Sequence, residues 1–215
     1  MNDLVFLSGQ PVHIGTPAVT WMDHGMVFER GRGARARKRK IDLVVLHWTG
    51  GENEPPAVFE TLEKRELGIE FAIGSDGLVW QFCDPSKIDT FDAGKFNGRS
   101  VGIEMVNYGH RPTLRQVPTA GLDRWQEDQV IHGRGMRVAN FYRPQMDAMV
   151  RLVDRLCDWY QIPKQYPYAK TVPECIEDFK GVAGHFHLTT RKTDPGLEPF
   201  RHLNTKGFKS WHGIC

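Results

Sequence analysis

The stretch LVVLHWTGG, residues 43–51, is the most informative part of this chain. Its short run of apolar residues ends at a pair of glycines, a pattern that predicts a buried strand leading into a loop. His47 would then lie at the end of that strand, on a rigid element beside a loop. An isolated histidine in such a place is more often a hydrogen-bonded structural residue than a metal ligand, so His47 needs support from elsewhere in the chain.

The residues that follow predict a helix and then a hairpin. Pro55 and Pro56 precede an apolar pattern that stops near Gly68, which is typical of a helix with proline in its first turn. Residues 70–74 and 78–82 flank the turn-forming sequence Ser-Asp-Gly and are expected to pair as antiparallel strands.

Two later segments complete the pattern. The sequence SVGIEMVN, residues 100–107, alternates its side chains between two faces and places Glu104 in mid-strand. Apolar residues then recur at helical spacing between Met146 and Tyr160, and the pattern stops at Ile162-Pro163. Strands that alternate with helices predict an α/β fold with a central β-sheet flanked by helices, and the hairpin makes that sheet mixed. Residues 108–143 show little periodicity and are interpreted as a long excursion.

Composition limits the classes of function. The chain has 215 residues, of which 40% are hydrophobic, and a formal net charge of +2, so one main domain is expected and overall charge does not indicate a polyanionic partner. Basic residues crowd one glycine-interrupted stretch, namely Arg30, Arg32, Arg35, Arg37, Lys38, Arg39 and Lys40. We interpret this stretch as a solvated, flexible lead-in, with an anion-binding arm as the alternative. It lacks the interleaved aromatic residues that stack on bases, so no nucleic-acid partner is expected.

No window is apolar enough to span a bilayer, and the N-terminus does not have the pattern of a signal peptide. We therefore expect a soluble protein made in the cytoplasm, without stable membrane insertion. The four cysteines, Cys83, Cys157, Cys175 and Cys215, form no CxxC pair and are expected to be reduced thiols, with Cys157 in the core.

A second group of metal-binding residue types lies in GHFHLTTRKTDPG, residues 184–196. A catalytic zinc ion needs about three protein ligands on rigid elements and leaves a fourth position for water. If this segment were a strand, His185 and His187 would point to the same side, so geometry alone does not choose between them.

The chain resembles the type 2 N-acetylmuramoyl-L-alanine amidase family, which includes phage lysis amidases, muropeptide-recycling amidases and peptidoglycan-recognition proteins. The resemblance covers roughly residues 41–200 and rests on the order and spacing of four motifs. They are HWTG at His47, SVGIE ending at Glu104, GH at His185, and KTDPG from Lys192 to Gly196.

The resemblance implies a fold like that of these amidases and recognition proteins, and a zinc ion held by His47, His185 and Asp194. It also implies that His187 is not a ligand but lies behind the ligands or faces the substrate. Glu104 and Lys192 would be catalytic: Glu104 would move protons between water and the leaving amine, and Lys192 would stabilise the oxyanion. The alternatives are a carboxylate in a surface salt bridge for Glu104 and a solvated side chain for Lys192.

The implied substrate is peptidoglycan or a muropeptide, cut at the amide between N-acetylmuramic acid and L-alanine. We divide the chain into an N-terminal extension, residues 1–40, and a zinc amidase domain, residues 41–215, and expect a monomer. The excursion resembles that of phage-borne members and favours an endolysin, which would reach the wall after the membrane is breached. A recycling amidase and a non-catalytic peptidoglycan-binding module are the alternatives.

The chain departs from the family at two places. Relatives carry an aromatic-histidine pair where this chain has Glu70-Phe71, and a His-Ala-Gly segment where it has Asp92-Ala93-Gly94. Contacts with substrate in that part of the cleft are therefore expected to differ.

Overall fold

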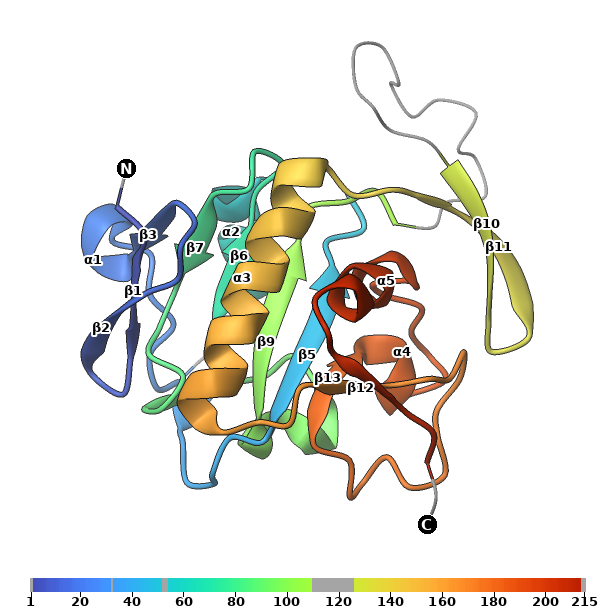
Figure 1. Cartoon of the computed structure of the whole chain (residues 1–215). Coiled ribbons are helices and arrows are strands. Elements are labelled where there is room, and N and C mark those ends of the chain that lie inside the picture. Colours follow the sequence, from blue (N-terminus) through green and yellow to red (C-terminus); the bar gives the residue numbers. More distant parts are fainter. Residues whose placement is uncertain (1, 32, 52–53, 110–125, 214–215) are drawn as a thin grey trace.

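A six-stranded mixed sheet forms the centre of the computed structural model, which describes residues 2–31, 33–51, 54–109 and 126–213 (Figure 1). In spatial order the strands are β13 (Gly181–Gly184), β5 (Leu43–Trp48), β9 (Ser100–Met105), β6 (Phe71–Ile73), β7 (Val79–Gln81) and β3 (Ala18–Thr20). Strands β6 and β7 pair antiparallel, whereas the other neighbours pair parallel. The predicted mixed sheet, its hairpin and its two central strands are confirmed.

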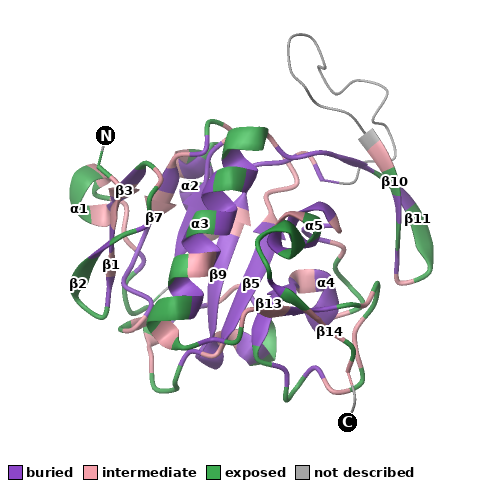
Figure 2. Ribbon diagram, in the orientation of Figure 1, coloured by how far each residue is buried: buried purple, intermediate pink, exposed green. Residues whose placement is uncertain are grey.

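Helices cover both faces of this sheet. Helix α3, Arg143–Tyr160, crosses the face that is in front in Figure 1, and α2, Pro55–Lys64, lies behind the sheet. Figure 2 shows that the side of α3 turned toward the sheet is buried and that its outer side is exposed. Both helices begin with proline in the first turn, where a missing backbone N–H costs no hydrogen bond.

The sheet separates two hydrophobic clusters, and this separation decides which face carries the site. Val44 and Leu46 of β5 belong to the cluster that contains the buried residues of α3. Leu43 and Val45 belong to a second cluster, with Phe96 and Phe179. Side chains alternate along a strand, so His47 follows Leu43 and Val45 on the face away from α3.

The remaining elements are shorter and surround the central sheet. They are β1 (Leu4–Leu7), β2 (Gln10–His13), α1 (Trp21–His24), β4 (Ala34–Ala36), β8 (Ile88–Thr90), a 3₁₀ helix η1 (Gly94–Arg99), β10 (Gln126–Ile131), β11 (Arg134–Ala139), β12 (Gln165–Pro167), α4 (His185–Leu188), α5 (Glu198–Thr205) and β14 (Lys209–Trp211). No described helix is both long enough and apolar enough to cross a membrane.

Residues before Ile41 pack onto the sheet. Strand β3 is its sixth strand, and Val5, Leu7 and Val12 belong to the same hydrophobic cluster as α3. Strand β4 pairs antiparallel with β8. A division of the chain at residue 40 stays a prediction, but the residues before it share the core of those after it.

The interpretation of the basic stretch as a flexible lead-in is wrong for Arg37, although Arg30 and Lys38 to Lys40 are exposed and Arg32 lies outside the described residues. The Arg37 side chain is 3% exposed and forms an ion pair with Glu70, with Nη2 2.9 Å from Oε1. Nη2 also donates a hydrogen bond to the carbonyl oxygen of Ser100 at 2.8 Å. A partner far along the chain removes Arg37 from water, which local composition cannot reveal.

We expect Arg37→Ala to lower the free energy of unfolding by about 3 kcal/mol, because it leaves the buried carboxylate of Glu70 without its counter-charge. Burial raises the pKa of Glu70 to about 7 even with Arg37 present. In the variant, folding therefore takes up a proton on Glu70, so the loss is expected to be larger at pH 8 than at pH 6. Urea unfolding at the two pH values measures this, with exposed Lys38→Ala as the control; equal stability of both variants would contradict it.

The structure adds detail to the excursion and corrects the expectation for the cysteines. The excursion, which shows little periodicity in sequence, contains the β10–β11 hairpin; its residues 110–125 lie outside the described part. Cys83 and Cys157 are free and buried, but Cys175 is disulfide-bonded, so the expectation of reduced thiols is wrong for that residue. Cysteines that are far apart in sequence can still be close in space. Cys215 lies outside the described residues.

Candidate metal centre and its cleft

His47 and Glu104 lie side by side on two parallel strands. The pairing of β5 with β9 places Glu104 opposite His47 in the register. Both residues stand near the carboxyl ends of their strands, where open α/β sheets form ligand-binding crevices. The strand pairing that the sequence predicts therefore brings a candidate ligand and a candidate base together.

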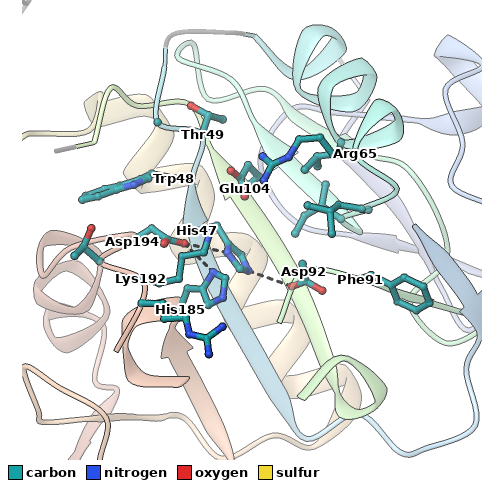
Figure 3. Close-up of a pocket in the computed structure, with 17 residues that line it drawn as sticks. His47, Trp48, Thr49, Arg65, Phe91, Asp92, Glu104, His185, Lys192 and Asp194 are labelled. Atoms are coloured by element: carbon teal, nitrogen blue, oxygen red, sulfur yellow. Dashed lines mark hydrogen bonds and ion pairs between the residues drawn. The ribbon is translucent and has the colours of Figure 1, made fainter. Parts of the chain in front are cut away.

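His185 and Asp194 reach the same place from the other side of β5. Strand β13 pairs with β5, and His185 follows it as the first residue of α4. The chain then returns, and the Phe186 N–H donates to the carbonyl oxygen of Asp194 at 3.0 Å. Figure 3 shows the three side chains converging: Asp194 Oδ2 lies 3.1 Å from His47 Nδ1 and 3.2 Å from His185 Nδ1.

These three residues fit a divalent metal ion. Each offers one ligand atom, and the atoms all lie within 4.8 Å of one another. Two imidazole nitrogens and a carboxylate oxygen are a donor set of catalytic zinc sites. The side chains of His47 and Asp194 are 5% and 9% exposed, so few water molecules compete for their ligand atoms.

The electrostatics of the cluster favour a cation at its centre. Burial acts to raise the pKa of Asp194, but the hydrogen bonds with His185 and His47 outweigh it and hold the pKa well below its usual range. Burial lowers the pKa of His185, which favours the neutral imidazole that binds metals. Burial also opposes protonation of His47, yet hydrogen bonds to Asp194 and Asp92 raise its pKa to about 10. A metal ion would displace that proton, because metal ligands must be deprotonated.

Glu104 and Lys192 border the same cleft. Burial raises the pKa of Glu104 to about 7, against the opposing charges of His47 and Lys192. A carboxyl group with such a pKa can accept and release a proton at neutral pH. No ion pair within the described residues involves Glu104, which removes support for a surface salt bridge. The side chain of Lys192 is exposed and lies near His185 and Asp194 in Figure 3.

Asp92 contacts the cluster directly, a role that the sequence did not predict. Its Oδ2 atom lies 3.1 Å from His47 Nε2, and the side chain is 7% exposed. The absence of a side chain at Gly102 makes room for it, since a Cβ there would lie 2.4 Å from Asp92 Oδ2. The available signal was the departure from His-Ala-Gly at this position. The structure shows a carboxylate that fixes the orientation of the His47 ring, as such carboxylates do for metal-binding histidines.

Glu70, at the other departure from the family pattern, does not border the cleft. It is 1% exposed, and its Oε2 accepts a hydrogen bond from the Gly102 N–H at 2.7 Å. Its Oε1 forms the ion pair with Arg37, so both carboxylate oxygens of Glu70 have buried partners. The expected change in substrate contacts therefore does not extend to the Glu70 side chain.

His187 points away from the metal-binding cluster. Residues 185–188 form a helical turn and not a strand, so the condition under which His185 and His187 would share a side is not met. His187 Nδ1 accepts a hydrogen bond from the Gly184 N–H at 3.0 Å, and Nε2 donates to the carbonyl oxygen of Ala169 at 3.0 Å. The imidazole is 1% exposed and stabilises the turn that presents His185.

The cleft that contains the cluster has a volume of about 310 Å³. Its walls come from the loop after β5, the C-terminal end of α2 with the segment after it, and residues 191–194. The three candidate ligands, Glu104 and Lys192 all border this one cavity, and so does Asp92. The structure thus joins all five residues that the sequence analysis proposed as a site.

The fold is that of the type 2 amidases and the peptidoglycan-recognition proteins. By sequence, residues 37–197 match the family described as N-acetylmuramoyl-L-alanine amidase. The chain belongs to this family. No curated protein sequence matches it.

Three solved structures illustrate the similarity of fold. An endolysin amidase from Clostridium intestinale is 16% identical, with 88% of this chain and 93% of that one covered and a TM-score of 0.55. The amidase AmiD from E. coli, in complex with an anhydro-N-acetylmuramic acid peptide, is 18% identical, with 97% and 67% covered and a TM-score of 0.55. The Drosophila peptidoglycan recognition protein SD is 16% identical, with 93% and 100% covered and a TM-score of 0.56.

Proposed function

We propose that this chain hydrolyses the amide bond between N-acetylmuramic acid and L-alanine in peptidoglycan, with zinc held by His47, His185 and Asp194. The observation that carries the proposal is the convergence of these three side chains in one cleft of an amidase-family chain. When bound, zinc supplies a Lewis acid that polarises the amide carbonyl and activates water.

The side chains around the cluster supply the proton transfers and the charge. Glu104 accepts a proton from the attacking water and delivers it to the nitrogen of L-alanine as the amide C–N bond breaks. The ammonium group of Lys192 stabilises the negative charge that develops on the carbonyl oxygen. The products are a carboxylate on the lactyl group of muramic acid and a free amino group on L-alanine.

We further propose that the substrate is the polymeric wall and that the chain is a phage or prophage endolysin. This rests on the resemblance of residues 108–143 to phage-borne members and on the fold shared with the Clostridium endolysin. The complex of AmiD with an anhydro-muropeptide supports the alternative of a recycling amidase.

Digestion of purified peptidoglycan and of a soluble anhydro-muropeptide in parallel tests both proposals. Mass spectrometry of the products is expected to show new amino ends on L-alanine and new carboxylates on the lactyl groups. We expect the polymer to be cut faster than the soluble muropeptide. Faster cleavage of the muropeptide would indicate recycling. Retention on the wall without new ends would indicate a binding module.

We expect Asp92→Ala to weaken zinc binding by about 10- to 100-fold, because the His47 ring loses the carboxylate that orients it. Asp92→Asn keeps an oxygen that can accept the same hydrogen bond and is expected to lose less. Competition with a chromophoric chelator measures the affinity without reference to turnover. Asp178→Ala, at an exposed carboxylate, is the control; equal affinity in Asp92→Ala and the control would show that Asp92 does not support the site.

A further inference from the structure

The tip of the β10–β11 hairpin carries an unusual residue for its conformation. Ile131 pairs with Arg134, so His132 and Gly133 form a two-residue turn, and their φ angles are 54° and 72°. A turn with two positive φ angles is usually made by Asn-Gly or Asp-Gly. A histidine is tolerated in the left-handed region but is not the residue that the turn itself favours. Turn geometry therefore does not explain the choice of histidine at position 132, and the contacts of its side chain have to be considered.

The His132 ring connects the hairpin to two other segments. Its Nε2 atom donates a hydrogen bond to the carbonyl oxygen of Lys192 at 2.9 Å, and Nδ1 lies 2.9 Å from the hydroxyl of Thr171. The backbone N–H of His132 also donates to the carbonyl oxygen of Lys170 at 2.8 Å. Because a carbonyl oxygen can only accept, Nε2 must carry the proton and Nδ1 accepts from Thr171.

The backbone N–H groups of Arg191 and Lys192 make only long hydrogen bonds within their own segment. The Lys192 N–H reaches the carbonyl oxygen of Thr189 at 3.4 Å, and the Arg191 N–H reaches Thr189 Oγ1 at 3.3 Å. Arg191 and Lys192 are exposed, so little packing fixes them. The bond from His132 is shorter than either of these. The hairpin therefore helps to set the position of the Lys192 backbone.

The same hairpin also holds the far end of this loop. Gln129 is 5% exposed, and its Oε1 accepts a hydrogen bond from the Leu197 N–H at 2.9 Å. The hairpin thus contacts the chain on both sides of Asp194, at Lys192 and at Leu197. A two-point attachment restricts the loop that carries a catalytic residue and a ligand, while the charged side chain of Lys192 stays free to enter the cleft.

We propose that His132 is a positioning residue that holds the Lys192 backbone and so aims the Lys192 ammonium into the cleft. The proposal rests on the proposed function for the catalytic role of Lys192. Interactions realised in the transition state depend on such placement, whereas binding of the rest of the substrate does not. Loss of the bond should therefore lower kcat and leave KM and zinc binding almost unchanged.

A pair of substitutions separates this role from stability. In His132→Asn the amide lies where Nδ1 lies and cannot reach Lys192, yet Asn-Gly is the favoured sequence for the turn. We expect kcat to fall about tenfold with KM, zinc content and Tm maintained. In His132→Gln the amide nitrogen reaches as far as Nε2 and should restore most of the loss. A wild-type kcat in His132→Asn, or equal kcat values in the two variants, would overturn the proposal.

Hydrogen exchange decides the proposal even if the wild-type chain cuts no peptidoglycan. In His132→Asn, amides of residues 189–197 are expected to exchange faster than in the wild type, while those of residues 43–49 stay unchanged. Unchanged exchange over residues 189–197 would show that His132 does not brace this loop, whatever the activity. If His132→Asn exchanges faster over residues 189–197 but keeps the wild-type kcat, His132 holds the loop without positioning Lys192 for catalysis. If the wild-type chain does not hydrolyse peptidoglycan, that result counts against the proposed function only.

Discussion

Replacement of His185 by alanine is expected to remove zinc and hydrolysis together. Its Nδ1 atom lies 3.2 Å from Asp194 Oδ2 at the centre of the cluster, and only two candidate ligands remain without it. Changes behind the ligands cost about 10- to 100-fold, so loss of a ligand should cost more than 100-fold in zinc affinity. Metal analysis of the purified protein, with one zinc per chain expected in the wild type, and peptidoglycan digestion measure the two losses.

His187→Ala is the matched control, because this imidazole lies two residues away and its hydrogen bonds within the described residues go to backbone groups. We expect it to keep zinc but to unfold at a lower temperature, since it leaves the Gly184 N–H and the Ala169 carbonyl without their partner in a buried place. Any loss of activity should be partial. Loss of zinc from His187→Ala with retention in His185→Ala would reverse the assignment of the ligand.

The central elements could be predicted because their signals are local. Residues 43–48 and 100–105 read as strands from their own side chains, and 143–160 reads as a helix from its own period. In each segment most of the buried positions are apolar ones, although Ser100 and Gln145 are buried as well. Prediction works where a segment carries enough apolar side chains to decide its own conformation.

The elements that were missed depend on partners elsewhere. Strand β3 has three residues and exists by pairing with β7, and β4 likewise depends on β8. Arg37 reads as a solvated cation until Glu70, from another part of the chain, is placed beside it. Composition reports the preference of a residue for water but not the presence of a buried counter-charge.

The candidate site also combines residues that local motifs reveal with contacts that depend on distant parts of the chain. The motifs named five candidate residues that border one cleft, and the pairing of three parallel strands brings their segments together. The motifs did not reveal what supports them: the contact of Asp92 with His47, or that of His132 with Lys192. These contacts span 45 and 60 residues, and each depends on one ring orientation in the folded chain.

Glu104→Gln is expected to fold and to keep its zinc but to lose about 10²- to 10⁴-fold in kcat, which corresponds to about 3–5 kcal/mol of the barrier. Glutamine has nearly the same shape and keeps an oxygen in the cleft, but it cannot accept the proton of water and return it to the leaving amine. Removal of a carboxylate whose pKa burial raises to about 7 also relieves an unfavourable burial, so stability should not fall.

The comparison that decides this role sets turnover against metal content in the same preparations. Glu63→Gln, at an exposed carboxylate of α2, makes the same chemical change outside the cleft and should behave as the wild type. If Glu104 only shaped the site, its loss would raise KM or release zinc, with kcat nearly unchanged for the chains that keep the metal. A wild-type kcat in zinc-loaded Glu104→Gln would move the proton transfer to another group that borders the cleft, and Asp92 would be the first to test.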